Sequence, residues 1–155
     1  MGVKQGDCLS PTLFSIFLNS LAEELLSSGV GLKLENDIFL NVLLCADDIV
    51  LMAEREEDLQ WLLYLVESWC LKWRLEINLT KTNIMHVRSS KKKRSIFTFL
   101  YNHRQVEYCT QYKYLGLNLS EFVDFNFTTG CLTDSAGRAL GSLCDQNDKD
   151  QWFPL

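Results

Sequence analysis

The chain has 155 residues, 47% hydrophobic and 23% charged, which suits one domain with a packed core and argues against wholesale disorder. Its formal net charge of −5 gives no overall attraction to nucleic acid, so any such binding must depend on a local basic patch. No apolar run is as long as a membrane span and the N-terminus lacks a secretory pattern, so we expect an intracellular protein with reduced thiols and no membrane contact. The six cysteines form no C-x-x-C pair, so we expect no zinc site.

The first predicted element is a helix near the N-terminus. Ser10 followed by Pro11 is a typical helix start, with Ser as the N-cap and Pro at the first helical position. Apolar residues then recur at helical spacing and form one broad face, until Gly29 and Gly31 end the helix. The residues of this face are Leu13, Phe14, Phe17, Leu18, Leu21, Ala22 and Leu25.

Two adjacent carboxylates, Asp47 and Asp48, interrupt the apolar stretch over residues 41–53. Short aliphatic runs on both sides predict two strands joined by a tight turn, preceded by strands around a turn at residues 35–37. Adjacent negative charges at the rim of a sheet need water or a cation, and Mg²⁺ is commonly held by one or two carboxylates. Since Asp is also a common turn residue, a plain solvated turn explains the same pattern.

A second helix is predicted over residues 54–74, with acidic residues in its first turn, where negative charge suits the helix dipole. We interpret its tryptophans as core residues rather than ligand contacts. Its apolar face comprises Leu59, Leu62, Leu63, Val66, Trp69, Cys70 and Trp73. Residues 75–83 then form a polar, turn-like segment.

Four consecutive cations, Lys91–Arg94, follow a short predicted strand over residues 84–87. A solvated loop is the simpler interpretation of such a charge run, and contact with nucleic-acid phosphates is the more specific interpretation.

The remaining predicted elements are short. Residues 96–108 indicate a hairpin that turns at residues 102–104. Residues 112–120 continue as a strand, in which Gly116 suggests a bulge or a close approach. Beyond residue 121 the pattern weakens to a possible short helix over residues 134–143 and a frayed tail.

Taken in order, four motifs resemble those of reverse transcriptases, with the closest similarity to non-LTR (LINE-type) retrotransposons. The motifs are Gly2-x-x-Gln5-Gly6 with Ser10-Pro11, then Ala46-Asp47-Asp48, Asn78-x-x-Lys81 and Tyr114-Leu115-Gly116. A chance match to the whole ordered set would be rare, although each motif is modest alone.

The resemblance implies an α+β fold: a polymerase palm fragment with an incomplete antiparallel sheet and two packed helices. The implied organisation is a partial palm over residues 1–120, a thumb remnant over residues 121–144 and an unstructured tail over residues 145–155. The implied activity is RNA-directed DNA polymerisation, a template-directed nucleotidyl transfer by a two-metal mechanism with Mg²⁺ or Mn²⁺. Its partners would be an RNA template, a DNA primer and deoxynucleoside triphosphates.

The resemblance also assigns roles to residues of the catalytic turn. Asp47 is the expected main metal ligand, with Asp48 beside it, and Lys81 is expected to face the triphosphate, where a cation can neutralise the leaving group. The family has an aromatic residue where this chain has Cys45, so we expect altered nucleotide handling.

Two further segments are implied to contact the substrates. Gln5 and Gly6 would line the incoming nucleotide and the template. Tyr114, Leu115 and Gly116 would bind the primer end.

The family's other metal-binding aspartate lies upstream of the glycine–glutamine–glycine segment, at which this sequence begins. We therefore expect the chain alone to be inactive as a polymerase, with an unpaired sheet edge and a partly uncovered first helix, as in a truncated retrotransposon reading frame. A fingers segment supplied in trans would complete it. The alternatives are a non-catalytic nucleic-acid-binding remnant that uses Lys81 and Lys91–Arg94, or a pseudogene-like product.

Overall fold

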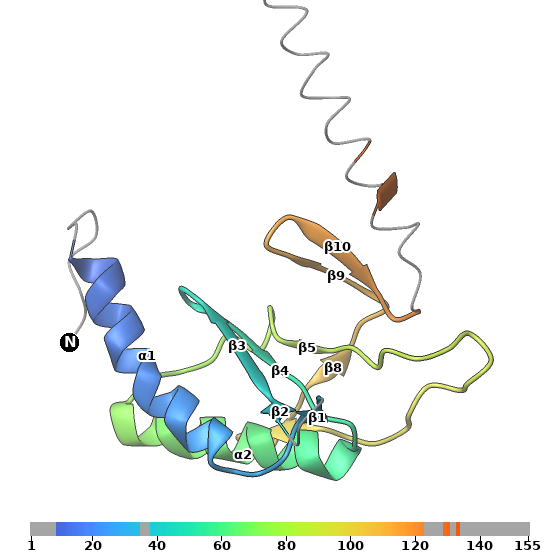
Figure 1. The fold of residues 1–155 in the computed structure, drawn as a ribbon. Coiled ribbons are helices and arrows are strands. Elements are labelled where there is room, and N and C mark those ends of the chain that lie inside the picture. The colour runs from blue at the N-terminus through green and yellow to red at the C-terminus, as the bar shows by residue number, and fades with distance from the viewer. Residues whose placement is uncertain (1–8, 35–37, 123–128, 131–132, 134–155) are drawn as a thin grey trace, which may run out of the picture. The chain divides into compact units, whose positions relative to one another are not determined.

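The computed structural model describes residues 9–34, 38–122, 129–130 and 133. The chain forms two compact units (Figure 1). Unit 1 comprises Met1–Thr82 and Phe97–Val106, and unit 2 comprises Asn83–Ile96 and Glu107–Leu155. The turn expected at residues 35–37, the helix expected at 134–143 and the tail fall outside the described residues. None of the described helices has the length and apolar character needed to cross a membrane.

Unit 1 is built on two helices that pack against each other, α1 (Ser10–Leu26) and α2 (Glu56–Trp73). Both were predicted, but Ser10 is not the N-cap of α1. The cap position is Leu9, and Ser10 is already helical, with Pro11 in the first turn, where its missing N–H costs no hydrogen bond. Among the described residues of unit 1, the buried side chains are those of Leu18, Leu21, Leu25, Asn41, Gln60, Leu62, Leu63, Val66, Trp69, Cys70, Phe99, Tyr101 and Val106.

Aromatic side chains join the two helices, as the helical spacing predicts. The Phe17 ring lies 4.9 Å from that of Trp69 and 5.0 Å from that of Trp73, and Trp69 Nε1 donates a hydrogen bond to Ser20 Oγ at 3.0 Å. Only the C-terminal half of the predicted α1 face is buried, since Leu13 is 53% exposed.

Short antiparallel pairs complete unit 1. The strands β1 (Leu32–Lys33) and β2 (Phe39–Leu40) form one pair, and β3 (Val42–Cys45) and β4 (Asp48–Leu51) form the next. The third pair is the predicted hairpin of β6 (Leu100–Tyr101) and β7 (Arg104–Gln105), whose turn residues Asn102 and His103 both have positive φ, as in a type I′ turn.

Gln60 of α2 holds the β6–β7 hairpin against the helix. Its Oε1 accepts from Leu100 N and its Nε2 donates to Leu100 O, both at 2.8 Å. This buried amide therefore satisfies its own polar atoms and anchors a strand at the same time.

Unit 2 contains a parallel pair and a hairpin. The strands β5 (Asn83–Ile84) and β8 (Glu107–Tyr108) run parallel, and β9 (Gln111–Tyr114) pairs antiparallel with β10 (Leu117–Ser120). The α+β class is confirmed, but the described strands form five two-stranded sheets rather than one antiparallel sheet. The long connection between β5 and β8 permits their parallel pairing.

Candidate active site

The β3–β4 hairpin presents the two adjacent aspartates at its tip. Cys45 pairs with Asp48, so the turn consists of two residues, Ala46 and Asp47. The predicted strand–turn–strand is therefore confirmed, with Asp48 as the first residue of β4. Both aspartate side chains and the Cys45 thiol are exposed.

The turn residue Ala46 has a positive φ of 54°. Two-residue hairpins favour turns with positive φ at the first central position, because this geometry follows the right-handed twist of the strands. The conformation costs an L-residue roughly 1–2 kcal/mol relative to glycine, and such strain often accumulates at functional sites.

The tip suits a divalent cation in its chemistry. Two exposed carboxylates offer the oxygen ligands that Mg²⁺ prefers, and substrate phosphates commonly complete such a site. Within the described part of the chain, no three His, Cys, Asp or Glu side chains cluster closely enough to form a metal site by themselves. Asp47 and Asp48 therefore fit as part of a ligand set that substrate or another segment completes.

Lys81 lies on a separate turn of unit 1 that Asn78 organises. The Asn78 Oδ1 atom accepts hydrogen bonds from Thr80 N at 3.0 Å and Thr80 Oγ1 at 2.7 Å. The Asn78 backbone oxygen accepts from Lys81 N at 3.1 Å and from Thr82 Oγ1 at 3.0 Å. This Asx turn shapes the backbone that presents the exposed Lys81 side chain.

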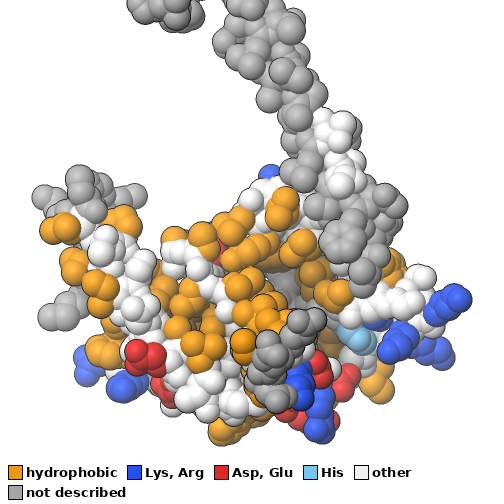
Figure 2. Space-filling model, in the orientation of Figure 1, with side chains coloured by type: hydrophobic (Ala, Val, Ile, Leu, Met, Phe, Trp, Pro, Cys, Tyr) orange, Lys and Arg blue, Asp and Glu red, His pale blue; other side chains and the backbone are white. Residues whose placement is uncertain are grey.

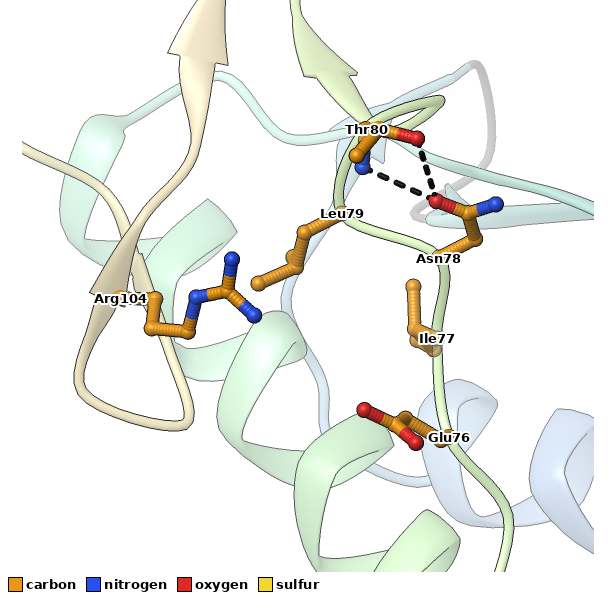
Figure 3. Close-up of a pocket in the computed structure, with 6 residues that line it drawn as sticks. All are labelled: Glu76, Ile77, Asn78, Leu79, Thr80 and Arg104. Carbon is orange, nitrogen blue, oxygen red and sulfur yellow. Dashed lines mark hydrogen bonds between the residues drawn. The ribbon is translucent and has the colours of Figure 1, made fainter.

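A shallow hollow of about 310 Å³ adjoins this turn (Figure 3). Glu76 and Arg104 bring opposite charges to its wall, and the side chain of Leu79 lies between the Arg104 guanidinium and the Asn78 segment. Sequence reasoning missed Arg104, because it lies on β7, far along the chain from the turn. The residues that line this hollow are Glu76, Ile77, Asn78, Leu79, Thr80 and Arg104.

The expected primer-binding segment lies in unit 2, at the turn between β9 and β10. Leu115 (φ 48°) and Gly116 (φ 85°) form the two-residue turn, and Tyr114 is the last residue of β9. The predicted bulge or close approach at Gly116 is wrong, since a Cβ there would meet no atom within 4 Å. Gln5 and Gly6 lie outside the described residues.

The basic run in unit 2 divides into two parts. Lys91, Lys92 and Lys93 are exposed, whereas Arg94 donates to Glu121 Oε2 through Nε at 3.1 Å and also through Nη2. Arg88 Nη2 donates to the same oxygen at 3.1 Å. The interpretation of all four cations as a solvated loop is therefore wrong for Arg94, because a distant carboxylate binds it.

The two units carry opposite charge. Over its full range, unit 2 contains eight Lys and Arg side chains against seven carboxylates, a net charge of +1, and five of its cations lie within residues 88–94. Unit 1 contains seven Lys and Arg side chains against thirteen carboxylates, a net charge of −6. Figure 2 shows Lys and Arg side chains gathered at the right edge of the view, where the loop that follows β5 projects in Figure 1.

The partly or fully buried thiols do not add a reactive group to the site. Burial raises the pKa of the Cys70 thiol, and a hydrogen bond with Tyr101 opposes this only in part. Burial also raises the pKa of Cys109. Both thiols therefore stay protonated near neutral pH and are poor nucleophiles.

Comparisons with known proteins agree with the order of the motifs. Residues 1–119 match the family described as reverse transcriptase (RNA-dependent DNA polymerase). The chain is 32% identical over 126 residues to the retrovirus-related Pol polyprotein from type-2 retrotransposable element R2DM of Drosophila melanogaster, a match that covers 77% of the chain and 12% of the relative. It is 28% identical over 130 residues to the RNA-directed DNA polymerase from mobile element jockey of Drosophila funebris, a match that covers 80% of the chain and 13% of the relative.

A third relative is the Pol polyprotein from type-1 retrotransposable element R2 of Nasonia vitripennis, 30% identical over 125 residues, covering 75% of the chain and 12% of the relative. The chain thus spans only 12–13% of the length of these curated relatives. No solved structure matches it.

Proposed function

The chain belongs to the reverse transcriptase family, and we propose that it forms part of the palm of an RNA-directed DNA polymerase of a non-LTR retrotransposon. The observation that carries this proposal is the tip of the β3–β4 hairpin. There, inside the segment that matches the family, Asp47 in the two-residue turn and Asp48 at the start of β4 are both exposed.

The proposed reaction is template-directed nucleotidyl transfer on an RNA template and a DNA primer, with deoxynucleoside triphosphates as substrates. Asp47 and Asp48 would hold a divalent cation, Mg²⁺ or Mn²⁺, which supplies positive charge to the reacting phosphate. Lys81 would place its ammonium group toward the triphosphate and stabilise the charge that develops on the leaving group.

The primer and template contacts are proposed from the family motifs. The turn at Leu115 and Gly116, together with Tyr114, would hold the primer end. Gln5 and Gly6 would line the incoming nucleotide and the template. An exposed turn suits a nucleic-acid strand better than a small ligand, and Leu115 is 59% exposed.

We further propose that the 155 residues by themselves do not extend a primer. The hairpin supplies two neighbouring carboxylates, and the described residues place no third carboxylate, cysteine or histidine in a cluster with them. A fingers segment with a further carboxylate, added in trans, would complete the site.

Primer extension with Mg²⁺ or Mn²⁺ tests both statements. The chain alone is expected to give no product, and the chain mixed with a fingers segment of an R2-type relative is expected to extend an RNA-templated primer. Asp47→Asn should abolish that extension, whereas Glu57→Gln on the exposed first turn of α2 should not alter it. Extension that survives Asp47→Asn would refute the assignment of the hairpin, and robust extension by the chain alone would refute its dependence on a partner.

A second candidate function, a non-catalytic nucleic-acid-binding module, is favoured by the run of exposed lysines in the loop that follows β5. Three exposed lysines, Lys91, Lys92 and Lys93, would contact phosphates without reading bases. Changing all three to Gln should weaken binding to duplex DNA and reduce its salt slope by about 0.9 for each phosphate that a lysine no longer neutralises.

The matched control changes three exposed cations of unit 1, Lys33, Arg55 and Lys72, to Gln. If the control lowers the salt slope as much as the triple lysine variant, binding depends on total charge and not on the lysine loop. Binding that survives Asp47→Asn but is abolished in the lysine variant would favour this function over polymerisation.

A further inference from the structure

Asn41 is a buried amide at the base of the hairpin that carries Asp47 and Asp48. It interrupts an apolar run between Leu40 and Val42 and is only 1% exposed. Burial of an amide is unfavourable by several kcal/mol, in the range of about 2–7, unless hydrogen bonds within the protein replace those made to water. Hydrogen bonds within the protein replace those of the Asn41 Nδ2 group, whereas the Oδ1 atom is buried without a partner among the described atoms.

The Asn41 carboxamide bonds to the end of α1 and the loop that follows it. Its Nδ2 donates to the Leu25 backbone oxygen at 2.6 Å and to the Val30 backbone oxygen at 3.0 Å, with Ser28 Oγ at 3.4 Å. The Leu25 carbonyl, in the last turn of the helix, also accepts from Ser28 N at 3.1 Å and from Ser28 Oγ at 2.6 Å. Asn41 therefore joins the hydrogen-bonded network that closes the end of α1 and ties the hairpin to it.

The backbone of Asn41 joins the other strand of the hairpin. Its carbonyl oxygen accepts from Met52 N at 2.9 Å, directly beyond the last paired residues, Val42 and Leu51. Gly31 lies against the same residue, since a Cβ at Gly31 would fall 2.8 Å from Asn41 Cβ. One residue thus connects both strands of the hairpin to the C-terminal end of α1.

The rest of the hairpin has weaker attachments. No residue of β3 or β4 is fully buried, and these strands pair only with each other among the described strands. From Asn41 to the tip, strand geometry gives a lever of about 15 Å, so a tilt of about 10° at the base moves the aspartates by roughly 2.5 Å. A displacement of about 1 Å at a reacting centre can reduce a rate by about 100-fold.

We propose that Asn41 is a positioning residue, which sets the orientation of the Asp47–Asp48 hairpin on α1 through its carboxamide. Its importance for catalysis rests on the proposed polymerase function, but its effect on geometry does not. Asn41 touches no reacting group, and its contribution is the direction in which the two carboxylates point.

The test measures the distance from the hairpin tip to α1 by pulsed electron paramagnetic resonance on the full chain. One nitroxide is attached to the native, exposed Cys45, and the second to a cysteine introduced by Asn19→Cys on the exposed side of α1. The five other cysteines are replaced: Cys70 becomes Ala, and Cys8, Cys109, Cys131 and Cys144 become Ser.

Asn41→Leu removes the donors at similar volume and is expected to shift or broaden the distance distribution by roughly 2.5 Å, the displacement that a tilt of the hairpin produces. Gln60→Leu is the matched control, because it also removes a buried amide with two backbone hydrogen bonds, but at β6. Gln60→Leu is expected to leave the tip distance unchanged, even where it lowers the melting temperature as much.

Gly31→Ala gives an independent variant if Asn41→Leu does not fold. It retains the carboxamide but pushes on Asn41 Cβ, and it should also move the tip. An unchanged distribution in a folded Asn41→Leu or in Gly31→Ala, or equal broadening in Gln60→Leu, would refute the proposal. Because no catalysis is measured, a negative primer-extension result does not affect this outcome, and a negative distance result does not affect the polymerase assignment.

Discussion

Unit 1 and unit 2 differ in the interactions that hold them together. Unit 1 buries an apolar core between two helices and carries a net charge of −6. Among the described residues of unit 2, the buried side chains are Ile84 and Glu121, and the latter binds two arginines. The described part of unit 1 thus depends on apolar packing, whereas that of unit 2 places one buried carboxylate between two arginines.

The ion-pair cluster of unit 2 has an unusual composition. Glu121 accepts from both Arg88 and Arg94, and the Arg88 guanidinium also lies 4.7 Å from the centre of the Phe122 ring. Two further donors of Arg88, Nε and Nη1, are buried without a hydrogen-bond partner among the described atoms. Such a cluster contributes little net stability but is costly to disrupt, because removal of one partner leaves a buried charge.

Truncation of the unit 1 core should have the largest effect on stability. Leu62→Ala at a fully buried position of α2 is expected to lower the free energy of unfolding by about 2–5 kcal/mol. Leu71→Ala on the same helix, where the side chain is 68% exposed, should change it by less than about 0.5 kcal/mol. Urea titration followed by tryptophan fluorescence measures both, and equal effects would contradict the burial pattern of α2.

Neutralisation of Glu121 should have the next largest effect and should be confined to unit 2. Glu121→Gln leaves Arg88 without its carboxylate and is expected to cost about 2 kcal/mol, less than for a fully buried pair because Arg94 is partly exposed. Segment-resolved hydrogen exchange should become faster around residues 88–94 and 118–122. The exposed Glu107 provides the control, since Glu107→Gln should leave these segments unchanged.

Alkaline pH should weaken unit 1 through Cys70 and Tyr101, whose pKa values are raised by burial. Above the ordinary thiol pKa of about 8.5, the unfolded chain loses protons that the folded chain retains, so stability falls as pH rises, by at most about 1.4 kcal/mol per pH unit for each group. Below that pH, the stability that the two protonated groups contribute to the folded state is fully present. Cys70→Ala should reduce the slope of unfolding free energy between pH 9 and 10, and an unchanged slope would show that this thiol is not involved.

The smallest effect is expected at the turn of the β3–β4 hairpin. Ala46→Gly relieves the positive φ but adds chain entropy to the unfolded state, so a net gain of about 0.5 kcal/mol is expected. Ala22→Gly within α1 should instead cost about 1 kcal/mol. Thermal melts of both variants measure the difference, and destabilisation by Ala46→Gly would show that Ala46 is not strained.

Local patterns in the sequence determined the elements whose causes are local. The two helices were placed within a few residues by their apolar periodicity, and the Asp47 turn by the aliphatic runs on either side of it. The turn at residues 102–104 was predicted from the strand-like runs on either side of it, and Asn102 and His103 form it. The turn at Leu115 was missed, because residues 112–120 have the pattern of one continuous strand.

The tertiary structure alone decided which residues distant in the chain meet. The pairing of Arg94 with Glu121, the parallel β5–β8 pair and the place of Arg104 beside the Asn78 turn all depend on contacts across long stretches of chain. Asn41 is the clearest case, because one polar residue in an apolar run predicts only that it needs partners. Which carbonyls it meets is set by how α1 and the hairpin pack, and that packing orients the two aspartates.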